Sequence, residues 1–207
     1  PCIIRRMDAH FLDRHPRLRD SLGLIIFVIG VIIGTIMINT FVFRSFGVQG
    51  PSMENTMHTN DRLIVDRLSV TIKQLQNKQY IPQRGQIIVF KNPNYNPTLG
   101  HDEYIVKRVI AFAGERVTVK NGVVTVYNTE HPNGFNPDTT VNKNEPKSPT
   151  SGDVDTKVSE GTVFVMGDNR EGNFSCDSRN CMGNTPLYDI VGPVIARIFP
   201  FTQIRGF

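Results

Sequence analysis

Cysteine and histidine are scarce in this sequence, with three and five residues respectively among 207. None of them combines with aspartate or glutamate at a spacing typical of a zinc site. No glycine-rich loop precedes a helix in the way that a phosphate-binding loop does. The net charge of +4 is small for a chain of this length and does not indicate nucleic acid as a partner. We therefore expect no metal, no other cofactor and no nucleic acid.

Charge is absent from residues 22–43, an apolar run rich in isoleucine, valine and phenylalanine. A helix of about 20 such residues crosses the hydrocarbon core of a bilayer. A cleavable signal sequence has a shorter apolar region, followed by small residues at the processing site. Residues 39–44 read Asn-Thr-Phe-Val-Phe-Arg and offer no such site. Residues 22–43 are therefore predicted to form an uncleaved transmembrane anchor.

The arginines around this run predict its orientation. Five arginines precede it within residues 1–21, whereas the first residues after it carry only Arg44. Because lysine and arginine stay on the cytoplasmic side, residues 1–21 are expected to form a cytoplasmic tail and residues 44–207 an extracytoplasmic domain. The protein is thus expected in the cell membrane as a single-pass protein, with membrane lipid as one partner.

The same topology separates the cysteines. Cys2 is expected in the reducing cytoplasm, which leaves Cys176 and Cys181 as a pair outside. Four residues lie between these two. The spacing alone leaves two alternatives open, a disulfide or two free thiols.

The expected extracytoplasmic part, about 160 residues, is long enough for one domain with a buried core. Its short runs of β-branched residues, closed by Gly, Pro or Asn, predict strands. Asn121-Gly122 predicts a tight hairpin, and helical periodicity is suggested only at 69–79. The polar stretch 128–159 is expected to be a surface insertion or a flexible loop. A mostly β domain is predicted, with strands at 62–68, 86–91, 104–110, 116–119, 122–127 and 161–166.

Ser52 is the first candidate for chemistry, because it lies in a turn just past the anchor, in the sequence Gly50-Pro51-Ser52-Met53. It does not lie in the Gly-x-Ser-x-Gly elbow of the α/β-hydrolases, since Glu54 stands where the second glycine would be. The histidines after the anchor all lie in loop-like contexts. A histidine base for Ser52 is therefore not indicated.

Lys107 is the second candidate, a lysine within an otherwise apolar strand. Alternation places it on one face with Ile105 and Val109, and Arg108 on the other with Val106. Desolvation by apolar neighbours lowers the pKa of a lysine, so that it can take the proton of a serine hydroxyl. A lone lysine on an edge strand more often serves to block aggregation. The combination with Ser52 favours the catalytic interpretation.

An ordered series of segments resembles the bacterial type I signal peptidases, in the form found in Gram-positive bacteria. The series consists of the anchor and residues 50–53, 61–65, 84–90, 104–115, 167–170 and 177–179. The resemblance covers nearly all of the chain after the anchor. It implies a signal-peptidase-like β-barrel or β-sheet catalytic domain behind one transmembrane helix.

The resemblance also implies roles for individual residues. Ser52 would be the nucleophile, with its N–H in the oxyanion hole, and Lys107 the general base. Ser175 matches a serine whose hydroxyl orients the lysine. Structural support would come from Arg108, Asp168, Asp177 and Arg179, and substrate contacts from Phe46, Val48, Gln49, Gly50, Met53, Ile105 and Val106.

Some positions depart from the family pattern. Gly50 stands where some members place a hydroxyl that serves as the second oxyanion donor, which leaves that donor unidentified. Two extra residues lie between Arg170 and Ser175, and Cys176 and Cys181 follow close behind this lengthened segment. A disulfide there would hold the segment in place.

The resemblance implies a serine endopeptidase that removes signal peptides from exported precursor proteins, cutting after small residues. One alternative is a membrane-anchored assembly factor of the same fold that binds exported chains without cutting them. Another is a soluble, self-cleaving repressor-type peptidase with the same pair of residues. The apolar anchor argues against the second, and an intact Ser52 and Lys107 argue against the first.

Overall fold

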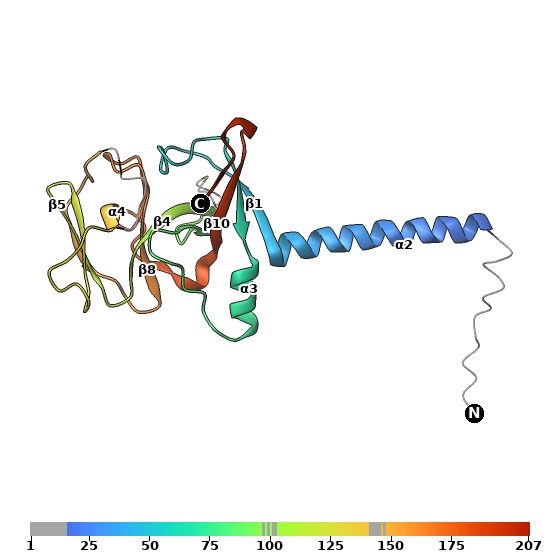
Figure 1. Cartoon of the computed structure of the whole chain (residues 1–207), viewed down its shortest axis with the longest axis horizontal. Helices are drawn as coiled ribbons and strands as arrows, with labels where there is room; N and C mark the ends of the chain where they lie inside the picture. The colour runs from blue at the N-terminus through green and yellow to red at the C-terminus, as the bar shows by residue number, and fades with distance from the viewer. Residues whose placement is uncertain (1–15, 97, 99, 101–102, 141–145, 147) are drawn as a thin grey trace, which may run out of the picture. The chain divides into compact units, whose positions relative to one another are not determined.

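The computed structural model describes residues 16–96, 98, 100, 103–140, 146 and 148–207 (Figure 1). The chain divides into two compact units, Pro1–Phe41 and Val42–Phe207. Most of the expected tail 1–21, with Cys2, lies outside the described residues, as does His101.

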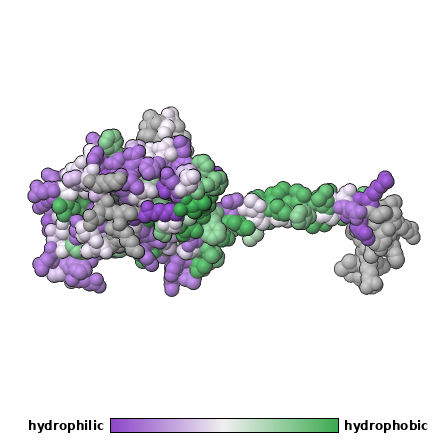
Figure 2. All heavy atoms as spheres, turned by 45° about the horizontal axis from the view of Figure 1, so that its top comes forward, coloured by the Kyte–Doolittle hydropathy of each residue, from purple (hydrophilic) through white to green (hydrophobic). Residues whose placement is uncertain are grey.

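Helix α2 (Pro16–Met37) forms most of the first unit and continues as a π-helical turn, Ile38–Val42. The helix begins at a proline, whose fixed φ suits the first helical turn. The segment Arg17–Val42 is long and apolar enough to cross a membrane by length and composition. Its exposed side chains are apolar along most of its length (Figure 2). Helical structure thus begins before the predicted boundary at 22 and ends at 42.

The second unit is built on an antiparallel eight-stranded sheet in the order β1-β2-β10-β3-β4-β8-β9, with β11 paired to β10. The predicted mostly β fold is confirmed. The predicted strands are present with shifted ends: β2 stops at Asp66, and β4 continues to Phe112. The strands are β1 (Phe43–Gly47), β2 (Arg62–Asp66), β3 (Ile87–Lys91), β4 (Tyr104–Phe112), β8 (Thr162–Met166), β9 (Thr185–Pro186), β10 (Ile190–Phe199) and β11 (Arg205–Gly206).

A smaller sheet, in the order β6-β5-β7, consists of β5 (Arg116–Lys120), β6 (Val123–Tyr127) and β7 (Val154–Lys157). The predicted hairpin joins β5 to β6. Asn121 and Gly122 both have positive φ, 51° and 80°, as its tight turn requires. The expectation that 128–159 contains no core element was wrong. Its end forms β7 along β5, and Val158 is buried among the apolar residues of β5 and β6.

Short helices complete the unit. Helix α3 (Leu68–Leu75) follows β2, and 3-10 turns lie at Leu187–Asp189 and Phe201–Gln203. The predicted helix at 69–79 is present but shorter. Asn77, with φ of 53°, reverses the chain just beyond its end, as an Asn or Gly commonly does. The four-residue helix α4 (Pro137–Thr140) lies within the polar stretch.

The apolar core consists of three clusters, and strands β3 and β4 contribute to their packing. One cluster joins β2, β3 and β10 to the turn that holds Met53 and Met57. A second joins β4 and β8 to the smaller sheet. A third lies between β3, β4 and β8 and contains Ile88 and Val109. Strand β4 is therefore held firmly from several directions, which makes it a rigid support for Lys107.

Candidate active site

Ser52 lies in the connection from β1 to β2, where residues 52–56 form turns. Two methionines fix this segment to the core. Met53 and Met57 are 1% and 0% exposed and pack with Val48. Met57 N donates to Met53 O at 2.9 Å. Ser52 itself stays partly exposed. The segment therefore presents the hydroxyl of Ser52 while its neighbours are buried.

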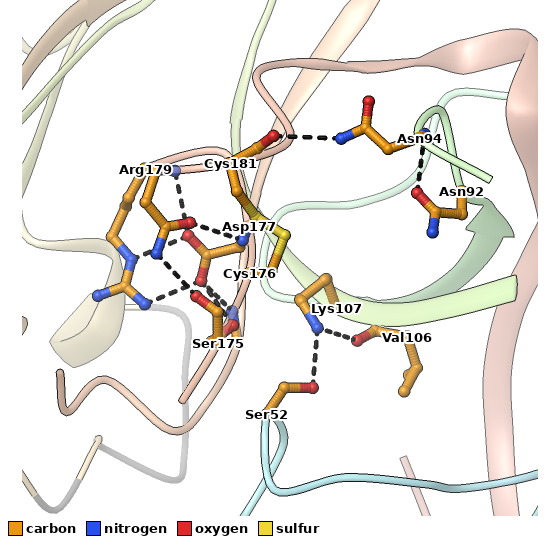
Figure 3. The surroundings of a disulfide bond; sticks show 12 residues. Ser52, Asn92, Asn94, Val106, Lys107, Ser175, Cys176, Asp177, Arg179 and Cys181 are labelled. Atoms are coloured by element: carbon orange, nitrogen blue, oxygen red, sulfur yellow. Dashed lines mark hydrogen bonds and ion pairs between the residues drawn. A yellow bond between two sulfur atoms is a disulfide. The ribbon is translucent and has the colours of Figure 1, made fainter. Parts of the chain in front are cut away.

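Lys107 lies in β4, and only 3% of its surface is exposed. Its partner across the β3–β4 pair is the fully buried Ile88. Lys107 Nζ donates to Ser52 Oγ at 2.8 Å and to Val106 O at 3.1 Å (Figure 3). A base must lie within such a distance of the proton that it abstracts. Two segments that are 55 residues apart in sequence thus place an amine against a hydroxyl.

Burial lowers the pKa of Lys107 from 10.5 to about 8, because the ammonium form loses its hydration. The carboxylates of Asp177 and Asp168 act in the opposite direction, since their negative charge stabilises the ammonium, and Arg179 acts with the burial. Desolvation is the largest of these influences. An amine with such a pKa is neutral in part near physiological pH, which is the state that a general base needs.

Asp168 joins β4 to the Ser52 turn. It lies just after β8 and receives two bonds from Arg108, Nε to Oδ1 at 2.7 Å and Nη2 to Oδ2 at 2.5 Å. Thr56 Oγ1 donates to the same carboxylate at 2.6 Å. All three side chains are buried. This bidentate pair holds the backbone of β4 next to Lys107 at a fixed distance from the serine turn.

Asp177 is the centre of a second buried network. It accepts hydrogen bonds from Ser175 Oγ at 2.7 Å, from Gly167 N at 3.0 Å and from Arg179 Nε and Nη2 at 2.9 Å each. Burial alone would raise the pKa of Asp177, but these bonds and the Arg179 charge outweigh it and lower that pKa. Ser175, expected to orient the lysine, is fully buried and donates to Asp177 in the described structure. Lys107 Nζ donates to Ser52 Oγ and Val106 O instead.

A cleft of about 460 Å³ opens beside Ser52 and Lys107. Six of the residues expected to contact substrate line it: Phe46, Val48, Gln49, Gly50, Ile105 and Val106. Met53 does not. It is buried beneath the serine turn, because its side chain serves the core. Glu103, Tyr104, Phe174 and Cys176 also line the cleft, and sequence reasoning did not select the first three.

The sequence as a whole matches the family described as "Signal peptidase, peptidase S26" over residues 19–199. The chain belongs to the signal peptidase I family.

Curated members of the signal peptidase I family align with most of the chain. Signal peptidase I of Bacillus amyloliquefaciens is 31% identical over 182 residues, which are 86% of this chain and 88% of the relative. A probable signal peptidase I-1 of Synechocystis is 32% identical over 170 residues, with 81% and 77% covered. A solved signal peptidase I from Enterococcus faecalis is 23% identical with a TM-score of 0.40, covering 56% of this chain and 98% of that one.

Gly167 lies in one of the segments that carry the family resemblance, but sequence reasoning gave it no role in the site. A β-carbon at this position would overlap Ser175 Oγ and the carbonyl oxygen of Ser52. Its N–H also donates to Asp177. Glycine therefore allows the Ser52 turn to approach the Asp177 network. Thr56 was missed as well, because no local pattern indicates a partner 112 residues away.

Cys176 and Cys181 form a disulfide, with their Cα atoms 5.5 Å apart, within the usual range for such a bond (Figure 3). Among the described residues, no group of three or more His, Cys, Asp or Glu side chains is arranged to hold a metal ion.

Proposed function

We propose that this protein is a membrane-anchored serine endopeptidase that removes N-terminal signal peptides from exported precursor proteins. The observation that carries the proposal is the 2.8 Å hydrogen bond from Lys107 Nζ to Ser52 Oγ, made by a buried amine. Burying a lysine costs stability, so a role in function is the reason that we give for its presence here. Here it contacts the hydroxyl of a partly exposed serine beside a cleft.

In the acylation step, the neutral amine of Lys107 takes the proton of Ser52 as Oγ attacks the scissile carbonyl carbon. The resulting ammonium then gives that proton to the leaving amine of the mature protein. An acyl-enzyme remains on Ser52. A water molecule, deprotonated by the same lysine, hydrolyses this ester and frees the signal peptide.

The tetrahedral intermediates in both steps carry a negative oxygen. The N–H of Ser52 is the donor that we assign to it, and one such donor is worth about 3 kcal/mol in the transition state. The 0%-exposed neighbours Ser175 and Asp177 do not touch the reacting atoms and instead position the site. The Arg108–Asp168 pair has the same supporting role.

The substrate would bind as an added strand. Strand β4 pairs with β3 from Tyr104 to Arg108, but its pairing with β8 starts only at Arg108. In the described part of the chain, no strand pairs with this edge at Tyr104–Val106, where Val106 O accepts from Lys107 Nζ, so an extended peptide would add to it there. This edge lines the cleft, and Val48 and Gln49 line the same cleft. Such a shallow apolar site favours small side chains before the cut bond.

The location proposed is the cell membrane, with the N-terminus in the cytoplasm and residues 44–207 outside. The apolar helix Arg17–Val42 and the arginines before it support this arrangement. Apolar area also interrupts the polar surface of the second unit (Figure 2). Phe199, Phe201 and Ile204 are exposed near its C-terminus and would rest on lipid.

The test is cleavage of a purified exported precursor by the full-length protein in detergent. Ser52→Ala and Lys107→Ala are each expected to abolish cleavage, whereas Ser159→Ala and Lys73→Ala, at exposed positions, are expected to leave it unchanged. The wild-type rate should rise with pH through about 8, as Lys107 becomes neutral. A wild-type protein that binds the precursor but never cuts it would favour the non-catalytic assembly factor instead.

A further inference from the structure

The disulfide lies at the wall of the candidate active site. Cys176 lines the same cleft as Ser52 and Lys107, and both half-cystines are exposed. Figure 3 shows the bond on the side of Lys107 away from Ser52. A dissolved thiol can therefore reach it, although its sequence neighbours Ser175 and Asp177 are fully buried.

The segment between the two cysteines is wound around Asp177. Asp177 O accepts from Cys181 N at 3.3 Å and from Met182 N at 3.1 Å. Asn180 Nδ2 donates to Ser175 O at 3.0 Å, and Asn180 Oδ1 accepts from Asp177 N at 3.0 Å. The covalent bond closes this short loop, so opening it would loosen the backbone on both sides of Asp177.

The loop is also joined to the segment before β4. Asn94 Nδ2 donates to Cys181 O at 3.2 Å (Figure 3). Asn92 N donates to Glu103 O at 2.8 Å. Glu103 directly precedes β4 and lines the cleft. The disulfide loop therefore contacts the segment that leads from β3 to β4, the strand on which Lys107 lies.

We propose that Cys176–Cys181 is a reversible thiol–disulfide modification site, at which a dithiol reductant switches the peptidase to a form with little activity at neutral pH. This inference rests on the proposed function of the Ser52–Lys107 pair. It adds a chemical partner, a dithiol, that the peptidase reaction does not need.

The exchange balances as two successive displacements. A thiolate of the dithiol attacks one cysteine sulfur, forms a mixed disulfide and releases the other cysteine as a thiolate, which takes a proton. The second thiol of the dithiol, once deprotonated, then attacks the first sulfur of the dithiol in the mixed disulfide. This closes the disulfide of the oxidised reductant and releases the remaining cysteine as a thiolate, which takes a proton. The dithiol is oxidised to a disulfide by two electrons, and the cystine is reduced to two thiols.

Reduction acts on the rate through the charged state of Lys107. The charged groups that influence this lysine are Asp177 and Arg179 in the disulfide loop and Asp168 after β8, while Glu103 lines the cleft. Opening the loop admits water, which removes the dominant desolvation and raises the pKa from about 8 toward 10.5. Moving the Asp177 carboxylate away would lower the pKa of Lys107, but its influence on that pKa is smaller than that of desolvation.

The experiment uses full-length protein with Cys2→Ser, so that Cys176 and Cys181 are the remaining cysteines. The protein in detergent is equilibrated with graded ratios of reduced and oxidised dithiothreitol, and free thiols are counted by maleimide labelling and mass spectrometry. Precursor cleavage is followed against pH at each ratio. Reduction is expected to shift the pH profile of the cleavage rate to higher pH. The rate at neutral pH should fall about tenfold for each unit by which the pKa of Lys107 rises, while the rate at alkaline pH stays the same. Oxidised dithiothreitol should restore it.

The control is Cys176→Ala with Cys181→Ala, which should resemble the reduced enzyme and ignore the reductant. Two free thiols before any reduction, or full reduction with an unchanged pH profile, would overturn the inference while leaving the peptidase intact. No cleavage by the oxidised protein at any pH would instead reject the proposed function and this inference with it. If the double variant does not fold, the Cys2→Ser protein alone tests the inference, through the change of its pH profile on reduction and the recovery of that profile on reoxidation.

Discussion

Replacing Lys107 with methionine is expected to abolish cleavage and to stabilise the fold at neutral pH. Methionine has a similar length and adapts well to a buried site. In the folded protein, burial lowers the pKa of Lys107 from 10.5 to about 8. Below pH ~8 both the folded and the unfolded chain carry the charge, so the folded state bears the full desolvation penalty. As pH rises from ~8 to ~10.5 the unfolded chain binds more protons than the folded one, and the penalty disappears.

The size of the effect follows from the same pKa change. At about 1.36 kcal/mol per pKa unit, the penalty at neutral pH is about 3 kcal/mol. The variant also loses the hydrogen bonds of Nζ to Ser52 Oγ and Val106 O, which are worth about 1 kcal/mol each. A net gain of about 1 kcal/mol remains, or roughly 2–4 °C in melting temperature for a domain of this size.

The assay is thermal unfolding of the full-length protein in detergent, followed by circular dichroism at about pH 7 and about pH 10. The variant should melt above the wild type at the lower pH and at or below it at the higher one. Lys73→Met, at an exposed position of α3, should show no such crossover. The reasoning would be refuted if the variant melted below the wild type at neutral pH and the difference between the two melting temperatures did not change with pH.

Two further substitutions test the supporting structure. Gly167→Ala is expected to abolish most cleavage, because its β-carbon would overlap Ser175 Oγ and the Ser52 carbonyl oxygen; activity close to wild type in the precursor assay would contradict that close approach. Asp168→Asn leaves Arg108 buried without its anion, and should lower the free energy of unfolding by about 3–5 kcal/mol in a urea titration. A loss below about 1 kcal/mol would mean that the buried pair contributes little.

The sequence predicted those strands whose β-branched runs are uninterrupted, such as β3 and β4. It did not predict β10, although this strand pairs with both β2 and β3. Gly192 and Pro193 interrupt its apolar run, and both residues are uncommon in the interior of a strand. In the structure they lie at a register shift in the β3 pairing, where the strand passes from one part of the sheet to the other. Strand β7 was missed because alternating polar residues in a polar stretch resemble a loop.

For the candidate site, sequence reasoning selected both residues that the fold brings into contact, since each had an unusual local setting. It could not supply their partners. Thr56 and Gly167 acquire their contacts through pairings between distant segments, which no local pattern encodes. Met53 was placed in the cleft by the resemblance, but it follows Ser52 directly, and successive residues of a turn point in different directions. Its large apolar side chain is buried in the core instead.

Under the proposed function, the free edge of β4 would also determine which chains are cut. An unpaired strand edge ordinarily recruits other strands and leads to aggregation. Here the edge lies in a cleft of about 460 Å³, which would receive a single extended segment. A folded domain has already paired its own strands and has no such segment to offer. The enzyme would therefore recognise the folding state of its substrate, cutting the unstructured junction and sparing the folded domain that follows.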